Sequence, residues 1–276
     1  VTDHHLPGAE LPAANVMVNP NLPGSRFGSR ALAGVGVAFY VMVALKRALD
    51  SAGLVAPSAP APAEWLDLVA LGTVADVVPL DFNNRVLVAQ GLARIRAGRC
   101  VPGIRALLEI ARRDRADLTA SDLGFAIAPR LNAAGRLDDM SIGIRCLLAD
   151  REVEARSLAA RLDQLNVERR AIEGQMQVQA LAAVRHLGPI ATPGARQRSG
   201  VCLFDATWHQ GVVGLVASRI KERLRRPVVA FAHGGDGLLR GSARSVAGVH
   251  VRDVLENIAA RHPGLIVRFG GHAMAA

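Results

Sequence analysis

One segment of the 276-residue chain limits the available folds more than any other. From Glu152 to His186, apolar residues recur at intervals of three, four and seven, and charged residues lie between them. This spacing predicts one long amphipathic helix. A loop from Thr192 to Gly200 follows it, so we expect the helix to join two domains. The apolar residues of the predicted face are Leu158, Leu162, Leu165, Ile172 and Met176.

The part after the helix has the pattern of a small α/β unit. Val201–Asp205 and Val228–Ala232 are short apolar runs with the length and composition of strands. Between them, Val212–Arg225 has the spacing of a helix. We therefore predict a second, smaller α/β domain over residues 188–276, with the connecting helix at 151–187.

The part before the helix, residues 1–150, is predicted to hold a parallel sheet. Val1-Thr2 resembles the end of a buried strand with polar side chains at its carboxyl edge, where open α/β sheets place their sites. Ser29 can cap a helix over Arg30–Ser51. The run Leu66–Pro79 is almost continuously apolar and is strand-like. The predicted fold class is therefore α/β.

Composition narrows the partners and the compartment. A formal net charge of +9 and a pI of about 10.9 favour a polyanionic partner such as nucleic acid, and a solvated Arg-rich surface is the alternative. The cysteines form no CxxC pair, which fits a reducing cytoplasm. The uncharged stretch Ala31–Leu45 is shorter than the ~20 residues that a membrane-spanning helix needs. We expect a cytoplasmic protein without a membrane partner.

Candidate metal ligands occur at two places in the sequence. Asp3, His4 and His5 form a compact set of hard and borderline donors in a strand-to-loop turn. Asp76 is a single carboxylate within an apolar run, where an ionised group is costly unless it is paired or bound to a cation. The alternatives are a solvent-facing polar turn for the first set, and a helix cap or buried salt bridge for Asp76.

Three further segments have the composition of phosphate-binding sites. Ala128–Leu137 places two arginines and an asparagine among small residues, and guanidinium groups suit phosphate oxygens. Gly241–Ser245 has the hydroxyls, guanidinium and backbone N–H groups of an anion-binding nest. Gly270–His272 is a glycine-rich turn that presents one histidine. A helix end with surface arginines and plain polar turns are the alternatives.

Taken in order, six motifs resemble those of the RecJ family within the DHH phosphoesterase superfamily. Each motif is weak alone, but their order matches and they span the chain. The motifs are Asp3–His5, Leu71–Leu80, Ala128–Leu137, Trp208–Arg219, Gly241–Ser245 and Gly270–His272.

The resemblance implies a DHH domain over residues 1–150, the connecting helix, and a DHHA1 domain over residues 188–276. It implies a metal-dependent 5′-to-3′ exonuclease that hydrolyses single-stranded DNA in recombination and repair, with two Mn²⁺ or Mg²⁺ ions. His4 and Asp76 would ligate metal. Asp3 would support the ligand geometry, and His5 would contact the scissile phosphate or assist proton transfer.

The resemblance also assigns a set of residues to the terminal phosphate and the DNA backbone. Contacts to the backbone carry no sequence preference, and a narrow passage between the domains would exclude duplex DNA. A helicase and a single-strand-binding protein are possible further partners. The residues so assigned are Arg130, Asn132, Arg136, Ser242, Arg244, Ser245 and His272.

The chain also departs from the family pattern. The family has an Asp-x-Asp motif and another Asp before the DHH motif, and an OB-fold region after the DHHA1 motif. Both ends of this chain therefore look cut, and we expect an incomplete copy that binds metal very weakly and is inactive alone. The alternatives are a DHH/DHHA1 phosphodiesterase acting on nanoRNA or cyclic dinucleotides, and a nucleic-acid-binding module without catalysis.

Overall fold

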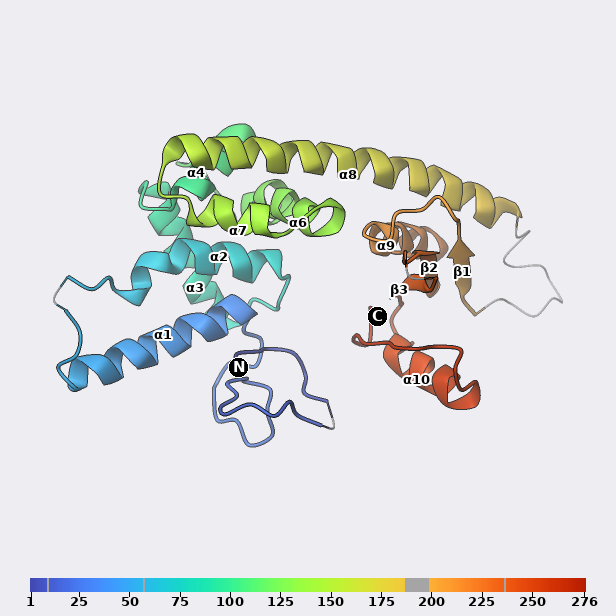
Figure 1. The fold of residues 1–276 in the computed structure, drawn as a ribbon, viewed down its shortest axis with the longest axis horizontal. Helices are drawn as coiled ribbons and strands as arrows, with labels where there is room; N and C mark the ends of the chain where they lie inside the picture. Colours follow the sequence, from blue (N-terminus) through green and yellow to red (C-terminus); the bar gives the residue numbers. More distant parts are fainter. Residues whose placement is uncertain (9, 57, 187–198, 236) are drawn as a thin grey trace. The chain divides into compact units, whose positions relative to one another are not determined.

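The structure, a computed structural model, describes residues 1–8, 10–56, 58–186, 199–235 and 237–276 (Figure 1). These residues divide into two compact units. Unit 1 comprises Val1–Ala134 and Asp139–Gln164, and unit 2 comprises Gly135–Asp138 and Leu165–Ala276. No helix within these described ranges has both the length and the hydropathy that a membrane span requires.

The long helix is confirmed as α8, Glu152–His186, and both units share it. Its buried residues follow the helical repeat. Ala155, Ala159 and Leu162 are buried in unit 1, whereas Met176 and Ala180 belong to the hydrophobic core of unit 2. The division between the units falls inside this helix, after Gln164. The loop expected from Thr192 lies largely outside the described residues.

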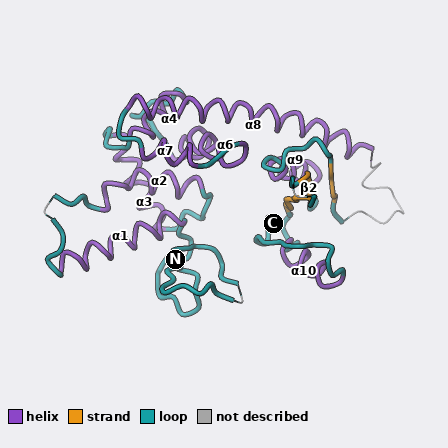
Figure 2. The backbone as a smooth tube through the Cα atoms, in the orientation of Figure 1, coloured by secondary structure: helices purple, strands orange, loops and turns teal. Residues whose placement is uncertain are grey.

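Unit 1 is built from helices, shown in purple in Figure 2. Within its described residues, β-structure is limited to one parallel bridge between Thr2 and Val18, which is all that the structure shows of the expected parallel sheet. The helices of unit 1, in addition to the first part of α8, are α1 Gly34–Ser51, η1 Pro62–Trp65, α2 Leu66–Ala75, α3 Phe82–Arg96, α4 Pro102–Ile110, α5 Ala120–Asp122, the π-helical turn η2 Leu123–Ile127, α6 Ala128–Leu137 and α7 Ser141–Leu148; the last three residues of α6 belong to unit 2.

The strand-like interpretation of Leu66–Pro79 is wrong, because the segment forms helix α2 and a turn. An apolar run without periodicity fits a buried helix as well as a buried strand. Val69 and Ala70 are buried where α2 packs against α1 and α3. Asp76 follows the last residue of α2, and 41% of its side chain is exposed. Asp76 is therefore not a carboxylate buried within an apolar strand.

Two predictions at the start of unit 1 are also wrong. Val1 is 64% exposed, so the first residues do not end a buried strand. Helix α1 begins at Gly34, and Ala33 precedes it without a side-chain cap. Ser29 is buried and donates a hydrogen bond to the carboxylate of Asp81 instead (2.6 Å). Ser29 thus joins two loops rather than capping a helix.

Unit 2 contains a three-stranded sheet in the order β1-β2-β3. The predicted strands are confirmed as β1, Val201–Phe204, and β2, Val228–His233, which pair in parallel across the predicted helix α9, Val213–Leu224. The third strand, β3, Leu239–Arg244, is antiparallel to β2.

Gly241–Arg244 is therefore extended strand, and the predicted nest is wrong. Helix α10 follows at Val251–Arg261. The mixed α/β class holds for the chain as a whole.

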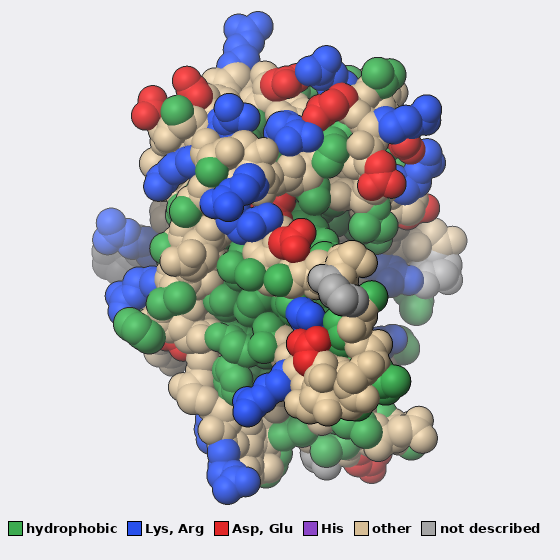
Figure 3. Space-filling model, turned by 90° about the vertical axis from the view of Figure 1, so that its left-hand side faces the viewer, with side chains coloured by type: hydrophobic (Ala, Val, Ile, Leu, Met, Phe, Trp, Pro, Cys, Tyr) green, Lys and Arg blue, Asp and Glu red, His purple; other side chains and the backbone are tan. Residues whose placement is uncertain are grey.

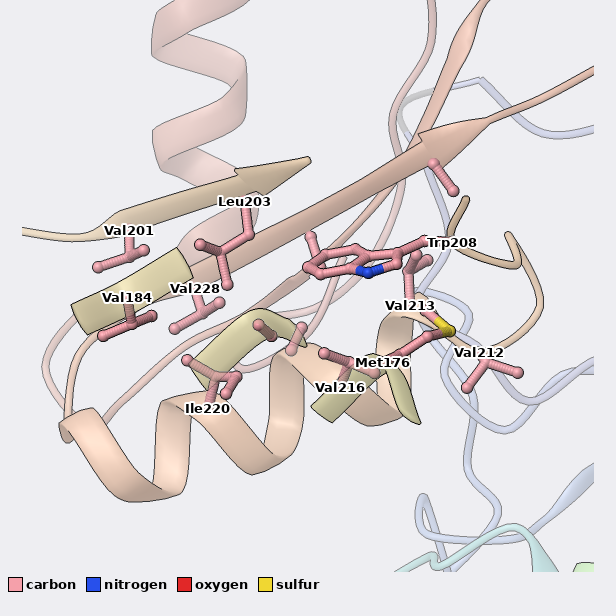
Figure 4. Close-up of a cluster of buried hydrophobic side chains, with 14 residues drawn as sticks. Met176, Val184, Val201, Leu203, Trp208, Val212, Val213, Val216, Ile220 and Val228 are labelled. Atoms are coloured by element: carbon pink, nitrogen blue, oxygen red, sulfur yellow. The ribbon is translucent and has the colours of Figure 1, made fainter. Parts of the chain in front are cut away.

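The core of unit 2 lies between the sheet, α9 and the second part of α8 (Figure 4). Trp208 is 5% exposed and lies among aliphatic side chains, while its indole N–H donates to Gln179 Oε1 (3.0 Å). A buried indole is stable only when this N–H finds an acceptor. The tryptophan of the Trp208–Arg219 motif is therefore a structural anchor between α8 and α9.

Unit 1 leaves part of its apolar surface exposed. Figure 3 views the molecule from the left-hand side of Figure 1, and an area of hydrophobic side chains lies there among Lys, Arg, Asp and Glu. Val43 and Leu45 of α1 are 39% and 55% exposed. Hydrophobic side chains are thus not confined to the interior of unit 1.

The contact between α2 and α3 depends on Gly91. A Cβ atom at this position would overlap the carbonyl group of Leu66 and the methyl group of Ala70. Gly91→Ala should therefore lower the free energy of unfolding by about 1–3 kcal/mol, as overpacking does. Urea denaturation followed by circular dichroism measures this change.

Gly174→Ala is the matched control. Gly174 lies in α8, and a Cβ there would meet nothing within 4 Å. Because alanine favours a helix over glycine, the control should be more stable than the parent chain by about 0.5–1 kcal/mol. Equal stability of the two variants would show that the α2–α3 contact tolerates a methyl group.

Candidate metal centre and phosphate-binding hollow

The structure brings together the two predicted metal ligands. His4 Nε2 and Asp76 Oδ2 lie 3.3 Å apart, although the residues come from separate segments of unit 1. The His4 side chain is 18% exposed and that of Asp76 is 41% exposed, so solvent reaches the pair. The His4 and His5 rings are neighbours, with centroids 4.3 Å apart.

Asp3 organises the backbone and the ring beside this pair. Its Oδ1 accepts hydrogen bonds from the backbone N–H groups of His4 (2.7 Å) and His5 (3.1 Å), and it lies 2.8 Å from His5 Nδ1. Burial raises the pKa of the Asp3 carboxyl, but these bonds from His5 and His4 lower it more, so the pKa lies below its ordinary value. In the tautomer that carries its proton on Nδ1, the His5 ring donates to this carboxylate.

The pair has the chemistry of part of a divalent-cation site. Adjacent ligands around an octahedral Mg²⁺ ion are separated by about 3 Å, and an imidazole nitrogen with a carboxylate oxygen suits Mn²⁺ as well. The 3.3 Å spacing of His4 and Asp76 fits this arrangement. Within the ranges that the structure describes, no group of three His, Cys, Asp or Glu side chains could hold a metal ion. The donor set fits, but it is partial.

A second site is a hollow of about 410 Å³ that lies wholly in unit 2. It combines the end of α6, the first turn of α9 and strand β3. Three of its residues, Arg136, Ser242 and Arg244, are predicted phosphate contacts. The lining residues are Gly135, Arg136, Gln210, Gly211, Val213, Gly214, Arg240, Gly241, Ser242 and Arg244.

Electrostatics in this hollow favour an anion over a cation. Burial lowers the pKa of the Arg244 guanidinium, and the positive charge of Arg136 lowers it further. Burial also lowers the pKa of Arg136, against the opposite effect of Glu173. Guanidinium groups stay protonated in proteins, so two like charges face one partly buried space. The N-terminus of α9 adds backbone N–H groups and the positive end of its dipole.

Close packing of α9 against β3 sets the shape of the hollow. Arg244 Nη1 donates to Ser242 Oγ (2.8 Å) and to the carbonyl of Ala243 (2.7 Å). Arg136 Nη1 donates to the carbonyl of Gly211 (3.1 Å). A Cβ at Gly214 would lie 2.8 Å from Arg244 Nη2 and 3.0 Å from Ser242 Oγ. The glycine therefore leaves these polar groups room beside the helix end.

Other predicted phosphate contacts lie elsewhere. Arg130 belongs to unit 1, where its Nε donates to Asp163 (2.8 Å), and Asn132 is exposed on the same helix. Ser245 is fully buried, and its hydroxyl donates to the carbonyl of Val249 (2.7 Å). His272 is exposed, and its backbone N–H donates to the carbonyl of Ala275 (2.7 Å). The hydroxyl of Ser245 is thus committed to the fold.

Two polar side chains that line the hollow, those of Arg240 and Gln210, were not among the predicted phosphate contacts. Arg240 lies on β3 two and four residues before Ser242 and Arg244, so strand alternation places all three on one face of the sheet. Gln210 precedes α9, within the Trp208–Arg219 motif. Recognition of Leu239–Arg244 as a strand would have revealed Arg240.

Comparisons with known proteins agree with this architecture. The DHHA1 domain family matches residues 197–276. The single-stranded-DNA-specific exonuclease RecJ of Dickeya dadantii is 60% identical over the whole chain, and that of Escherichia coli K12 is 58% identical. The chain spans 48% of the length of both relatives. A crystal structure of Thermus thermophilus RecJ with Mn²⁺ matches 99% of the chain and 37% of that protein, with 36% identity and a TM-score of 0.79.

A crystal structure of exonuclease RecJ bound to manganese covers 99% of the chain and 62% of that protein, with 38% identity and a TM-score of 0.73. Residues 197–276 thus match the DHHA1 domain, and the fold of the described residues matches that of RecJ. The similarity extends through both units rather than through unit 2 alone. Over its whole length, the chain is similar to the RecJ exonucleases.

The shape of the hollow gives a direct test of anion binding. In the Gly214→Ala variant, the added methyl group should displace the guanidinium of Arg244 and weaken one charge-assisted hydrogen bond to a bound anion. Such a loss, about 1.5 kcal/mol, corresponds to a roughly tenfold lower affinity. Titration with inorganic phosphate, followed through the arginine Nε–H signals by NMR, measures the affinity.

The melting temperature should change little, because the displaced group is the end of a flexible side chain and alanine favours the helix. Gly174→Ala serves again as the control. If Gly214→Ala bound phosphate as tightly as the parent chain, Arg244 and Ser242 would not form the anion site.

Proposed function

We propose that the protein containing this chain is a metal-dependent exonuclease that removes nucleotides from single-stranded DNA in the 5′-to-3′ direction, during recombination and repair. The observation that carries the proposal is the 3.3 Å approach of His4 and Asp76. Relatives that match the chain over its whole length are named for single-stranded-DNA-specific exonuclease activity. The two metal ions, the polarity and the cellular role belong to this proposal.

His4 and Asp76 would hold the cations through one imidazole nitrogen and one carboxylate oxygen. Bound divalent ions supply an activated water and stabilise the charge that develops on the phosphoryl oxygens. Structures of RecJ contain Mn²⁺ in one case and Mg²⁺ in another. Asp3 would keep the proton of His5 on Nδ1. His5 Nε2 could then accept a proton or a hydrogen bond from a group at the scissile phosphate.

The hollow in unit 2 would hold the phosphate at the 5′ end of the strand. Arg136 and Arg244 offer guanidinium forks, and Ser242 offers a hydroxyl. Contacts to phosphate carry no base preference, which suits a nuclease that degrades any sequence. Arg130 retains a role in DNA binding in this proposal, together with Asn132 and His272. Arg130 Nε donates to Asp163 and its Nη1 donates to the carbonyl of Ala126 (2.6 Å), so the N–H groups that remain would serve this purpose.

The 276-residue chain by itself is a different case. Among the described residues, the predicted ligands that lie together are His4 and Asp76, and a cation held by two protein donors binds weakly. We infer that this chain alone is a nucleic-acid-binding module with little or no hydrolysis. A specific observation favours this second function, since no three-residue metal-binding group is present in the part of the chain that the structure describes.

Partners and compartment are further proposals. Single-stranded DNA is the proposed substrate, and the net charge of +9 favours its association with the chain. We propose a helicase and a single-strand-binding protein as partners that expose and present the strand. The three cysteines carry free thiols, which is consistent with the reducing cytoplasm that we propose for the protein.

A chimera tests the catalytic proposal. Residues 1–276 of this chain would replace the matching segment of the Escherichia coli relative, which is 58% identical. The chimera should degrade long 5′-phosphorylated single-stranded DNA. His4→Ala or Asp76→Ala should lower the rate more than about a hundredfold, because each removes a metal ligand. DNA affinity, measured by fluorescence anisotropy, should stay nearly unchanged.

Asp50→Asn is a control carboxylate variant from unit 1 outside the candidate centre, because Asp50 pairs with Lys46 on α1 (3.2 Å). Unchanged hydrolysis in the His4 and Asp76 variants would remove these residues from the metal site. A chimera that cleaved only dinucleotides and spared long DNA would instead favour a nanoRNA or dinucleotide phosphodiesterase.

A further inference from the structure

The His4–Asp76 pair is held by side-chain amides from other parts of unit 1. Asn21 Nδ2 donates to the carbonyl of His4 (2.7 Å), and Asn19 Nδ2 donates to the carbonyl of His5 (2.9 Å). The two asparagines are also linked, because the backbone N–H of Asn21 donates to Asn19 Oδ1 (2.8 Å). The backbone of both histidines is thereby fixed from outside the Asp3–His5 segment.

The same connection continues towards Asp76. Asn21 Nδ2 also donates to the carbonyl of Arg30 (3.1 Å). The next carbonyl, that of Ala31, accepts from Asn84 Nδ2 (2.7 Å). Asn84 Nδ2 donates as well to the carbonyl of Pro79 (2.9 Å), in the turn that follows Asp76. The hydrogen bonds of these amides therefore run from the loop that carries His4 to the loop that carries Asp76.

A carboxylate and a hydroxyl reinforce the second half of this connection. Ser29 Oγ donates to Asp81 Oδ2 (2.6 Å), and the backbone N–H of Asn84 donates to Asp81 Oδ1 (2.9 Å). Burial raises the pKa of the Asp81 carboxyl, but these bonds from Asn84 and Ser29 lower it more, so the pKa lies below its ordinary value. Asp81 is thus ionised at neutral pH and fixes both segments.

Burial explains why these bonds constrain the loops strongly. Asn19 is 6% exposed, Ser29 is 4% exposed and Asn84 is fully buried. A buried polar group is costly unless it is hydrogen-bonded, and its bonds are stronger where the local dielectric is low. The candidate ligands are more exposed, and each extends from a loop. The most strongly constrained residues of the site are therefore the buried Asn19, Ser29 and Asn84, and not the ligands themselves.

We propose that Asn19, Asn21 and Asn84 are positioning residues that set the distance between His4 and Asp76 before any metal binds. The proposal rests on the proposed function, in which these two side chains are metal ligands. None of the three asparagines needs to touch metal or DNA. Their amides act on main-chain carbonyl groups, so they set the position of the loops and not the chemistry of the ligands.

The test uses the 276-residue chain without metal. Its eight histidines are few enough for selective ring labelling, so that a nuclear Overhauser contact between the His4 ring and the Asp76 β-protons can be assigned. This contact should be present in the parent chain, because the two polar atoms lie 3.3 Å apart. Asn21→Ala should abolish the contact.

Asn21 is only partly buried, so its variant should fold with a melting temperature within about 4 °C of the parent. Asn84→Ser removes the buried amide that donates to the carbonyls of Ala31 and Pro79. If this variant folds, it should also lose the contact between His4 and Asp76. If it does not fold, the result for Asn21→Ala decides whether the proposal holds. Asn257→Ala is the matched control, because Asn257 Nδ2 donates to the carbonyl of Asp253 (3.0 Å) in unit 2. This variant should retain the contact.

A contact that persists in folded Asn21→Ala would overturn the proposal. Addition of MnCl₂ to the parent chain tests the metal site separately from the role of the asparagines. The metal site is supported if Mn²⁺ broadens the His4 ring signal in the parent chain and does not broaden it in Asp76→Ala. An absence of broadening would contradict the metal site, even if the asparagines position the two side chains as proposed.

Discussion

The approach of His4 to Asp76 depends on hydrogen bonds between two loops that no regular secondary structure joins. Asn84 and Asn21 donate to main-chain carbonyl groups in both loops, and Ser29 binds the carboxylate of Asp81. Helices α2 and α3 position the loop between them, because Asp76 follows the last residue of α2 and Asp81 caps the N-terminus of α3. The position of a candidate ligand is therefore set by the packing of helices and by buried amides.

In unit 2, the main physical constraint is that positively charged side chains lie close together. Arg136 and Arg244 share a small hollow, and the charge of Arg136 lowers the pKa of Arg244. Hydrogen bonds to Ser242 and to backbone carbonyls hold the two guanidinium groups in place. A bound phosphate would relieve the repulsion between them. The folding of unit 2 thus brings two like charges together, which favours the binding of an anion.

The sequence predicted the elements with regular periodicity well. Helix α8 begins and ends at the predicted residues, and β1, α9 and β2 lie within about one residue of their predicted bounds. Helix α2 was misread because a uniformly apolar run has no period. Strand β3 was missed because Leu239–Arg244 is polar and contains a glycine, which is unusual for a strand.

Some of the predicted site residues lie together in the structure, and others do not. His4 and Asp76 were paired by the family resemblance, and the structure places them together. Arg136, Ser242 and Arg244 also meet, but Ser245 is used within the fold. The three positioning asparagines gave no signal, because amides that bond main-chain carbonyls in irregular loops follow no spacing in the sequence. Their partners become visible only when the loops are folded.

Calorimetric titration of the 276-residue chain with MnCl₂ measures whether His4 and Asp76 form a metal site. With these two donors we expect one weak site with a Kd of about 1 mM, which corresponds to about 4 kcal/mol of binding free energy. Asp76→Ala should remove this site. Two tight sites, or a site that is unchanged in Asp76→Ala, would show that the His4–Asp76 pair is not the partial cation site described above.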